Sequence, residues 1–150
     1  MHNFNWKKLS ATSALICSHG GRSIRLRLGF TGGSVVSADV VDFLQALRPE
    51  IPRRMILLWD RLPAHKSRQT RSYLEAATQP GWLQLEWLPP YAPELNPVEY
   101  LWGHLDGGVM ANYAPSTLRE IRQRVECGAQ RIRRRPDVLR GFLKASGLFF

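Results

Sequence analysis

Cysteine is scarce in this sequence, and long apolar runs are absent. The two cysteines, Cys17 and Cys127, form no spaced motif. This usage is typical of a reducing compartment, and we expect both to be buried as small apolar side chains. No apolar run approaches the roughly 20 residues that span a bilayer, and the N-terminal MHNFNWKK lacks the apolar stretch of a signal peptide. The sequence therefore predicts a cytoplasmic protein with no membrane partner.

Acidic residues are also few, since 12 Asp and Glu face 21 Lys and Arg, which gives a formal charge of +9 at pH 7. A chain this basic attracts polyanions, so nucleic acid is the default partner. Residues 117–150 alone carry nine Lys or Arg against three acids, a net of 9 − 3 = +6. Contacts between such residues and phosphate predict DNA binding that weakens steeply with salt.

The candidate DNA-binding residues form two groups, one in the middle of the chain and one near its C-terminus. They are His65, Lys66, Arg68, Arg119, Arg122, Arg131, Arg133, Arg134 and Arg135. The alternative is that the arginines and lysine belong to ordinary solvated helix faces, and that the histidine only hydrogen-bonds its own loop.

The first third of the chain predicts a β-hairpin followed by a helix. Leu9–Cys17 is a strand candidate, and residues 23–30 alternate apolar and basic side chains with the period of a half-buried strand. HGGR lies between them as a turn, because glycine accepts positive φ. Residues 37–50 repeat apolar side chains at helical spacing, and Ser37 is the expected N-cap.

The remainder predicts alternating strands and helices. Met55–Trp59 is a continuous apolar run, typical of a strand buried on both faces of a sheet. A helix over residues 66–79 with Ser67 as its cap, a strand over 82–90 and a helix after Asn96 follow. Residues 117–150 read as a helix, a break at Pro136 and a second helix. This order predicts an α/β fold with parallel central strands, in one domain that spans residues 1–150.

Two carboxylates stand out in this pattern, because each follows a strand. Asp60 comes directly after the apolar run, and Glu99 lies in the first turn of the next helix but one. Functional groups gather at the carboxyl ends of parallel strands, so both can face one sheet edge and bind a divalent metal together with phosphate. The alternatives are structural: Asp60 caps a turn, and Glu99 closes a capping box with Asn96.

Two motifs carry these carboxylates: LLWDRLPAHKS contains Asp60, and LEWLPPYAPELNPVEYLW contains Glu99. Together they resemble the paired signatures of DDE-superfamily transposases, in the bacterial insertion-sequence branch related to the mariner elements. The second motif carries every element of the family signature. The spacing is 38 residues between the two carboxylates, slightly longer than is usual in the family.

The resemblance implies an RNase H-like fold, a mixed sheet flanked by helices, in which three carboxylates bind two Mg²⁺ or Mn²⁺ ions. Such enzymes cut DNA at transposon ends and join the freed 3′ hydroxyl to target DNA. The resemblance therefore implies double-stranded DNA as the partner, and nucleoid association would follow from binding it. By this resemblance Asp60 is the second catalytic and metal-binding carboxylate, and Glu99 is the third. The Pro-rich segment before Glu99 would then aim its helix at the sheet edge.

The sequence departs from the family at the first carboxylate, which should end the first strand. The only aspartates before Asp60 are Asp39 and Asp42, and both fall in the first predicted helix. The chain therefore resembles a catalytic domain truncated at its N-terminus and lacking the first strand. Arg61 also stands where the family often has Asn.

Two functions remain open. The first is a nuclease and strand-transfer part that is inactive alone and needs the missing strand from an upstream transposase polypeptide, or works as a homo-oligomer. The second is a non-catalytic, basic DNA-binding remnant that modulates an intact transposase.

Overall fold

The computed structural model describes residues 8–51, 53–78 and 80–148. Contacts divide the chain into two compact units: Met1–Ser34 with Pro93–Phe150, and Val35–Ala92. We call the first the hairpin unit and the second the parallel unit, after the strands that each contains. The single domain expected for residues 1–150 stays a prediction.

The hairpin unit is built on two antiparallel strands, β1 (Leu9–Cys17) and β2 (Ile24–Gly32), whose register runs from Leu9↔Gly32 to Cys17↔Ile24. The predicted hairpin is confirmed. The turn uses the paired glycines of the short helix η1 (His19–Gly21) at positive φ, 74° and 65°. Alternation along β2 buries Ile24 and Leu26 and exposes the arginines between them.

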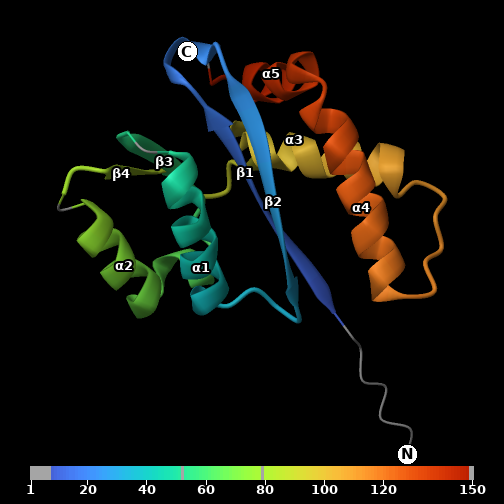
Figure 1. The fold of residues 1–150 in the computed structure, drawn as a ribbon, viewed down its shortest axis with the longest axis horizontal. Helices are drawn as coiled ribbons and strands as arrows, with labels where there is room; N and C mark the ends of the chain where they lie inside the picture. Colours follow the sequence, from blue (N-terminus) through green and yellow to red (C-terminus); the bar gives the residue numbers. More distant parts are fainter. Residues whose placement is uncertain (1–7, 52, 79, 149–150) are drawn as a thin grey trace, which may run out of the picture. The chain divides into compact units, whose positions relative to one another are not determined.

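Three helices of the same unit pack with the apolar side of this hairpin. They are α3 (Pro97–His104), α4 (Leu118–Arg133) and α5 (Pro136–Ala145), with the short helix η4 (Pro93–Leu95) before α3 and the π-helix η5 (Leu105–Val109) after it. Figure 1 shows α4 running alongside β2. The core joins strand residues such as Leu26 to Leu101 of α3, Ile132 of α4 and Leu139 of α5. The predicted helix break at Pro136 is confirmed.

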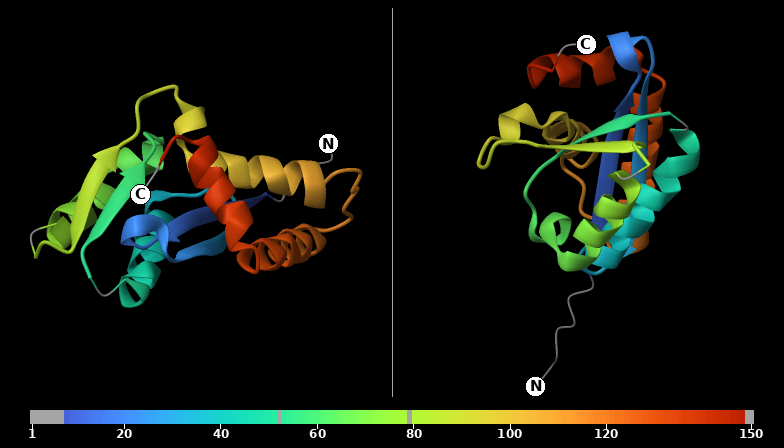
Figure 2. Two further views of the ribbon diagram at one scale, coloured as in Figure 1. Left: turned by 90° about the horizontal axis from the view of Figure 1, so that it is seen from above. Right: turned by 90° about the vertical axis from the view of Figure 1, so that its left-hand side faces the viewer.

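The parallel unit contains β3 (Met55–Trp59) and β4 (Leu83–Trp87), paired in parallel from Met55↔Leu83 to Trp59↔Trp87. Its helices are α1 (Ser37–Leu47) and α2 (Arg68–Thr78), with short helices η2 (Arg48–Glu50) and η3 (Pro63–Lys66). In Figures 1 and 2 α1 and α2 lie side by side. The predicted strand–helix–strand order and parallel pairing are therefore confirmed.

The helix caps of this unit show one correct prediction and one error. Ser67 caps α2 as expected, because its Oγ accepts a hydrogen bond from the Thr70 N–H at 3.1 Å. Ser37 does not cap α1. Val36 occupies the N-cap position, and the Asp39 carboxylate three residues later accepts from the Val36 N–H at 2.8 Å. Asp39 is therefore a helix-terminal residue rather than a strand-end carboxylate.

The expectation that Met55–Trp59 is buried on both faces is wrong. Ile56 and Leu58 are 63% and 38% exposed, whereas Leu83 of the paired strand is 3% exposed. The cause is that helices α1 and α2 leave the Ile56–Leu58 face of this sheet uncovered. An unbroken apolar run thus marks a strand with one covered face here.

The described strands pair as two two-stranded sheets, one antiparallel and one parallel. Within the described residues β1 pairs only with β2, and β3 pairs only with β4, so each of these sheets keeps an unpaired edge. The predicted α/β fold is confirmed, whereas the missing first strand stays a prediction, because any two-stranded sheet has open edges. Across the described part of the chain, no helix is long and apolar enough to cross a bilayer.

Candidate functional site

Asp60 lies directly after β3, at the carboxyl end of the parallel sheet. Its Oδ1 is 2.7 Å from His65 Nδ1 and accepts a hydrogen bond from the Leu62 N–H at 3.2 Å. His65 Nδ1 is also 3.3 Å from the Asp60 carbonyl oxygen. The turn through η3 brings the histidine back over the end of the strand. The second carboxylate oxygen, Oδ2, has no hydrogen bond within the described residues, so it is available to another partner.

The same contacts keep Asp60 ionised. Partial burial raises the pKa of this carboxyl, but the hydrogen bonds from His65 and from the Leu62 N–H, with the charge of His65, lower it by more. The pKa of Asp60 therefore lies below its ordinary value. At neutral pH the group is an anion with one oxygen already oriented, which suits it to hold a cation.

Aromatic contacts within the parallel unit hold the His65 ring beside Asp60. The ring of Trp59 lies 3.9 Å from that of His65 between centroids, and Trp59 stacks on Trp87 at 6.2 Å with an angle of 8°. The His65 side chain is only 11% exposed. His65 thus positions Asp60, and little of its surface remains for direct contact with DNA.

Glu99 lies in the first turn of α3, in the hairpin unit. Asn96 caps this helix as expected, since its Oδ1 accepts from the Val98 N–H at 3.1 Å. The predicted capping box with Glu99 is wrong, because the Asn96 N–H donates instead to the Pro93 carbonyl at 2.9 Å. The 3₁₀ turn at residues 93–95 supplies that acceptor. The Glu99 carboxylate is exposed and makes no hydrogen bond or ion pair within the described residues.

The surroundings of Glu99 are a shallow hollow of about 530 Å³ on the hairpin unit. Glu94 and His104 also line it. Each carboxylate, Asp60 in its own unit and Glu99 in the other, offers the oxygen ligands that Mg²⁺ prefers. Among the described residues, however, no group of three His, Cys, Asp or Glu side chains could hold a metal ion. The donor chemistry fits a divalent cation, while a complete set of three carboxylates is not gathered.

The candidate DNA-binding cations divide into free and engaged side chains. Arg133 donates to the Leu26 carbonyl at 3.0 Å, Arg135 pairs with Asp137 at 2.7 Å, and Arg122 lies over the Phe30 ring at 5.2 Å. These three arginines already have partners within the hairpin unit. Four others are exposed, with side chains that make no hydrogen bond or ion pair in the described ranges: Lys66, Arg68, Arg119 and Arg134.

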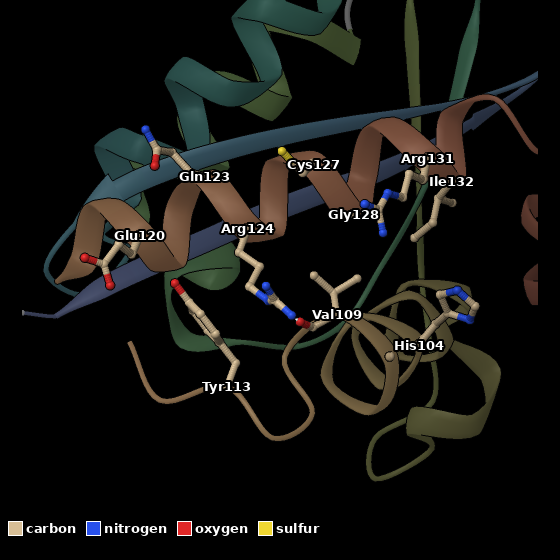
Figure 3. Close-up of a pocket in the computed structure, with 11 residues that line it drawn as sticks. His104, Val109, Tyr113, Glu120, Gln123, Arg124, Cys127, Gly128, Arg131 and Ile132 are labelled. Carbon is tan, nitrogen blue, oxygen red and sulfur yellow. Dashed lines mark hydrogen bonds between the residues drawn. The ribbon is translucent and has the colours of Figure 1, made fainter. Parts of the chain in front are cut away.

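Arg131 lines a groove of about 610 Å³ between α4 and the segment around η5 (Figure 3). In this view its side chain extends from α4 toward the part of the chain that carries Val109 and His104. Cys127 lies on the same side of α4 and is exposed, so the expectation that both cysteines are buried is wrong for it. Cys17 is half-buried, and burial raises the pKa of its thiol.

Arg61 connects the ends of the two parallel strands. Its Nε donates to the Leu88 carbonyl at 3.4 Å, and the Leu88 N–H donates to the Trp59 carbonyl at 2.8 Å. The residue that departs from the family pattern thus fastens the segment after β4 to the loop that carries Asp60.

Tyr91 is a feature that sequence reasoning missed. It has φ 58°, the left-handed region that favours glycine, and its side chain is fully exposed. A turn with proline followed by a positive φ is the type II pattern, whose third position is usually Gly or Asn. A tyrosine there costs about 1–3 kcal/mol of backbone strain. The Pro-Tyr pair in the motif was a usable signal for the turn, but not for its strain.

The site therefore has the parts of one class of protein. An α/β fold with an ionised, oriented carboxylate at the end of a parallel strand, and an exposed one at the start of a later helix, fits the RNase H-like nucleases. The sequence profile of the DDE superfamily endonucleases matches residues 6–122. This match exceeds half of the chain and includes Asp60 and Glu99. The chain belongs to the DDE superfamily endonucleases, and the resemblance to a transposase catalytic domain is confirmed.

Solved structures support the same fold. The chain is similar to the Mos1 transposase catalytic domain with raltegravir and Mg, at 19% identity and a TM-score of 0.53, covering 95% of this chain and 84% of that one. The corresponding structure with Mn gives 17% identity, a TM-score of 0.52 and the same coverage. The Mos1 paired-end complex with the left transposon end gives 16% identity and a TM-score of 0.51, and the match covers 95% of this chain and 56% of that one. No curated protein matches the sequence.

Proposed function

We propose that this chain provides Asp60 and Glu99 as catalytic, metal-binding carboxylates of a DDE transposase that cuts DNA at transposon ends and joins it to a target. The observation that carries the proposal is the state of Asp60. It is ionised, one oxygen is fixed by His65 and the Leu62 N–H, and the other oxygen has no partner in the described residues.

Mg²⁺ or Mn²⁺ is the cofactor that this donor chemistry favours. Divalent ions held by carboxylates activate water and stabilise the leaving oxygen in phosphodiester cleavage. In this chain Asp60 and Glu99 would hold the ions. His65 fixes the rotamer of Asp60, and Asn96 fixes the first turn of α3, from which the exposed Glu99 projects. The similar Mos1 catalytic domain, whose structures are with Mg and with Mn, supports the same choice of ions.

The chain alone should be inactive. Two carboxylates hold one ion weakly, and Mg²⁺ is bound reluctantly without more ligands because it gives up its water slowly. A further carboxylate would come with a strand that pairs with the open edge of β1 or of β3. We propose that an upstream transposase polypeptide or a second copy of the chain supplies it, by addition of a strand to a sheet edge.

A second candidate function is a non-catalytic DNA-binding protein that modulates an intact transposase. The observation in its favour is that most of the positive charge belongs to the hairpin unit, whereas the candidate carboxylate Asp60 belongs to the parallel unit. The hairpin unit has 14 Lys or Arg and 6 Asp or Glu, which gives 14 − 6 = +8, whereas the parallel unit has 7 − 6 = +1. A strongly basic unit binds DNA whether or not cleavage follows.

The deciding experiment is a nicking assay on supercoiled DNA with Mg²⁺ or Mn²⁺. It compares the chain alone with a fusion to an upstream segment that ends an apolar strand in Asp, and with the same fusion carrying Asp60→Asn or Glu99→Gln. We expect nicking only by the unmutated fusion. Asp42→Asn serves as the matched control, because Asp42 is an exposed carboxylate on α1 and should leave nicking unchanged.

Other results would contradict specific parts of the proposal. Robust nicking by the unfused chain that Asp60→Asn abolishes would mean that its carboxylates suffice. Undiminished nicking by the Glu99→Gln fusion would remove Glu99 from the site. DNA binding without nicking in every fusion would favour the modulator.

A further inference from the structure

Tyr91 is held in an unusual way for a fully exposed aromatic side chain. Its backbone is at φ 58°, and its ring lies wholly on the surface. An exposed aromatic ring normally lowers its free energy by packing against the protein surface, and glycine would fit this turn without strain. Tyr91 therefore combines a strained backbone conformation with a fully solvent-exposed ring.

The turn that carries Tyr91 follows β4 at the same edge of the parallel sheet as Asp60, which directly follows β3. Leu88 is bonded to the end of β3 through the Trp59 carbonyl and is also bonded to Arg61. Tyr91 follows only three residues later, so its Cα lies within about 11 Å of that of Leu88. Both residues belong to the parallel unit, and both stand beyond the carboxyl ends of its two strands.

The charges at this edge favour a nucleic acid over a protein. Arg61, Lys66 and Arg68 follow Asp60 within eight positions, and all three are exposed. Lys66 and Arg68 flank the N-terminal end of α2, whose free N–H groups add positive potential. Cations beside an exposed aromatic ring are the combination that binds single-stranded nucleic acid, because the cations neutralise phosphates while the ring stacks on a base.

We propose that Tyr91 is a positioning residue whose ring stacks on an unpaired base of the DNA strand next to the phosphate at Asp60. The inference rests on the proposed function and adds the contact that holds the strand. The strained turn fixes the backbone before binding, so less conformational freedom is lost when the base stacks. A paired base inside a duplex has its faces covered by neighbours, so the ring selects an unpaired or terminal base.

The test measures binding of the chain to a duplex that contains one unpaired 2-aminopurine. The buffer is metal-free, so that the DNA is not cleaved during the measurement. Stacking on the ring should quench the emission of the base, and the same duplex with the base paired should show little change. Tyr91→Phe keeps the ring and should bind and quench like the unmutated chain. Tyr91→Asn keeps a residue that accepts positive φ but has no ring. We expect it to bind the unpaired probe about 10-fold more weakly, with quenching abolished.

Two controls separate stacking from charge and from folding. Ile56→Ala removes another exposed apolar side chain of the parallel unit, from within β3, and should change neither binding nor emission. The ratio of affinities between the unmutated chain and Tyr91→Asn should be the same at low and high salt, because only phosphate contacts release counterions. Tyr91→Asn should melt no lower than the unmutated chain, because the ring is fully exposed and Asn accepts the positive φ with less strain.

Equal affinity and equal quenching for Tyr91→Asn and the unmutated chain would overturn this inference. A Tyr91→Asn change seen only in self-association would overturn it in favour of a protein contact. The proposed function is judged separately by the nicking assay, because aminopurine binding needs neither metal nor the further carboxylate that cleavage requires. Failure of nicking with normal quenching would leave the stacking contact standing, and the reverse result would leave the catalytic assignment standing.

Discussion

At the scale of single residues, the pairing of His65 with Asp60 decides the chemistry of the candidate site. The carboxylate is partly buried, which alone would raise its pKa and favour the neutral acid. Hydrogen bonds to one oxygen reverse that effect. The stacking of His65 on Trp59 keeps the imidazole in place without a further polar partner in the described residues.

The first prediction concerns this pair. His65→Ala removes one hydrogen bond and the nearby positive charge while Asp60 stays partly buried, so the pKa of Asp60 should rise. His65→Asn can still donate a hydrogen bond from its amide, and should give an intermediate pKa. The measurement is a carboxyl ¹³C NMR titration of the three proteins. An unchanged pKa in His65→Ala would show that the Leu62 N–H suffices.

At the scale of elements, the contact between α4 and the π-helix η5 fixes how α3 ends. Gly128 lies inside α4, and a Cβ there would stand 2.5 Å from Val109 Cγ2 and 3.0 Å from Leu105 Cδ2. Arg124, one turn earlier, donates to the Val109 carbonyl at 2.6 Å and covers the Tyr113 ring at 4.2 Å (Figure 3). The absence of a side chain at Gly128 therefore lets the two elements approach closely.

The second prediction compares two helical glycines. Gly128→Ala gains helix propensity of about 1 kcal/mol, but it overpacks Val109 and Leu105 at a cost of about 1–3 kcal/mol. We expect a lower free energy of unfolding, by up to about 2 kcal/mol. Gly141→Ala in α5 is the matched control, because a Cβ there meets nothing within 4 Å. It should raise the free energy of unfolding by about 0.5–1 kcal/mol.

Urea unfolding followed by circular dichroism measures both variants. If Gly128→Ala stabilises the chain as much as Gly141→Ala does, η5 moves aside without cost and the close contact does not constrain α3.

At the scale of the whole molecule, charge is distributed unevenly between the two units. Nearly all of the net +9 belongs to the hairpin unit, at 14 − 6 = +8. Several of its arginines are already bonded to the protein, such as Arg133 to Leu26 and Arg135 to Asp137. Phosphate binding therefore depends on the exposed arginines that lack such partners within the described residues.

The third prediction tests which arginines bind phosphate. The chain should bind a labelled duplex with an affinity that falls steeply between low and high salt. Replacing Arg119 and Arg134 together by Gln should reduce the slope of log affinity against log salt by up to about 0.9 for each phosphate that is no longer neutralised. Arg48→Gln is the control, since Arg48 lies over the Trp82 ring and donates to the Ile51 carbonyl. Arg48→Gln removes one charge where the double replacement removes two, so half of the double replacement's reduction in slope would mean that net charge, and not position, governs binding.

Much of the local structure followed from the sequence. The periods of the apolar residues predicted the hairpin, the parallel strands and the C-terminal helices, and the short caps at Ser67 and Asn96 formed as their chemistry requires. The two carboxylate motifs were also sufficient to indicate the family, because a long motif of prolines, Asn and Glu is specific in itself. These features depend on residues close together in the chain, where geometry leaves few alternatives.

The tertiary structure decided what the local patterns left open. From the sequence, Glu99 could close a capping box with Asn96. The Asn96 N–H donates to the Pro93 carbonyl instead, so the Glu99 carboxylate has no hydrogen bond in the described residues. Arg133 was a candidate DNA contact from the sequence, but its Nε donates a hydrogen bond to the Leu26 carbonyl, 107 residues away in the sequence. The apolar run Met55–Trp59 likewise did not indicate that the Ile56 side chain is exposed. The sequence determined which groups exist and where their helices and strands begin. Packing between distant segments determined which of those groups remain free to bind, because hydrogen-bond partners and covering helices come from parts of the chain that no local pattern describes.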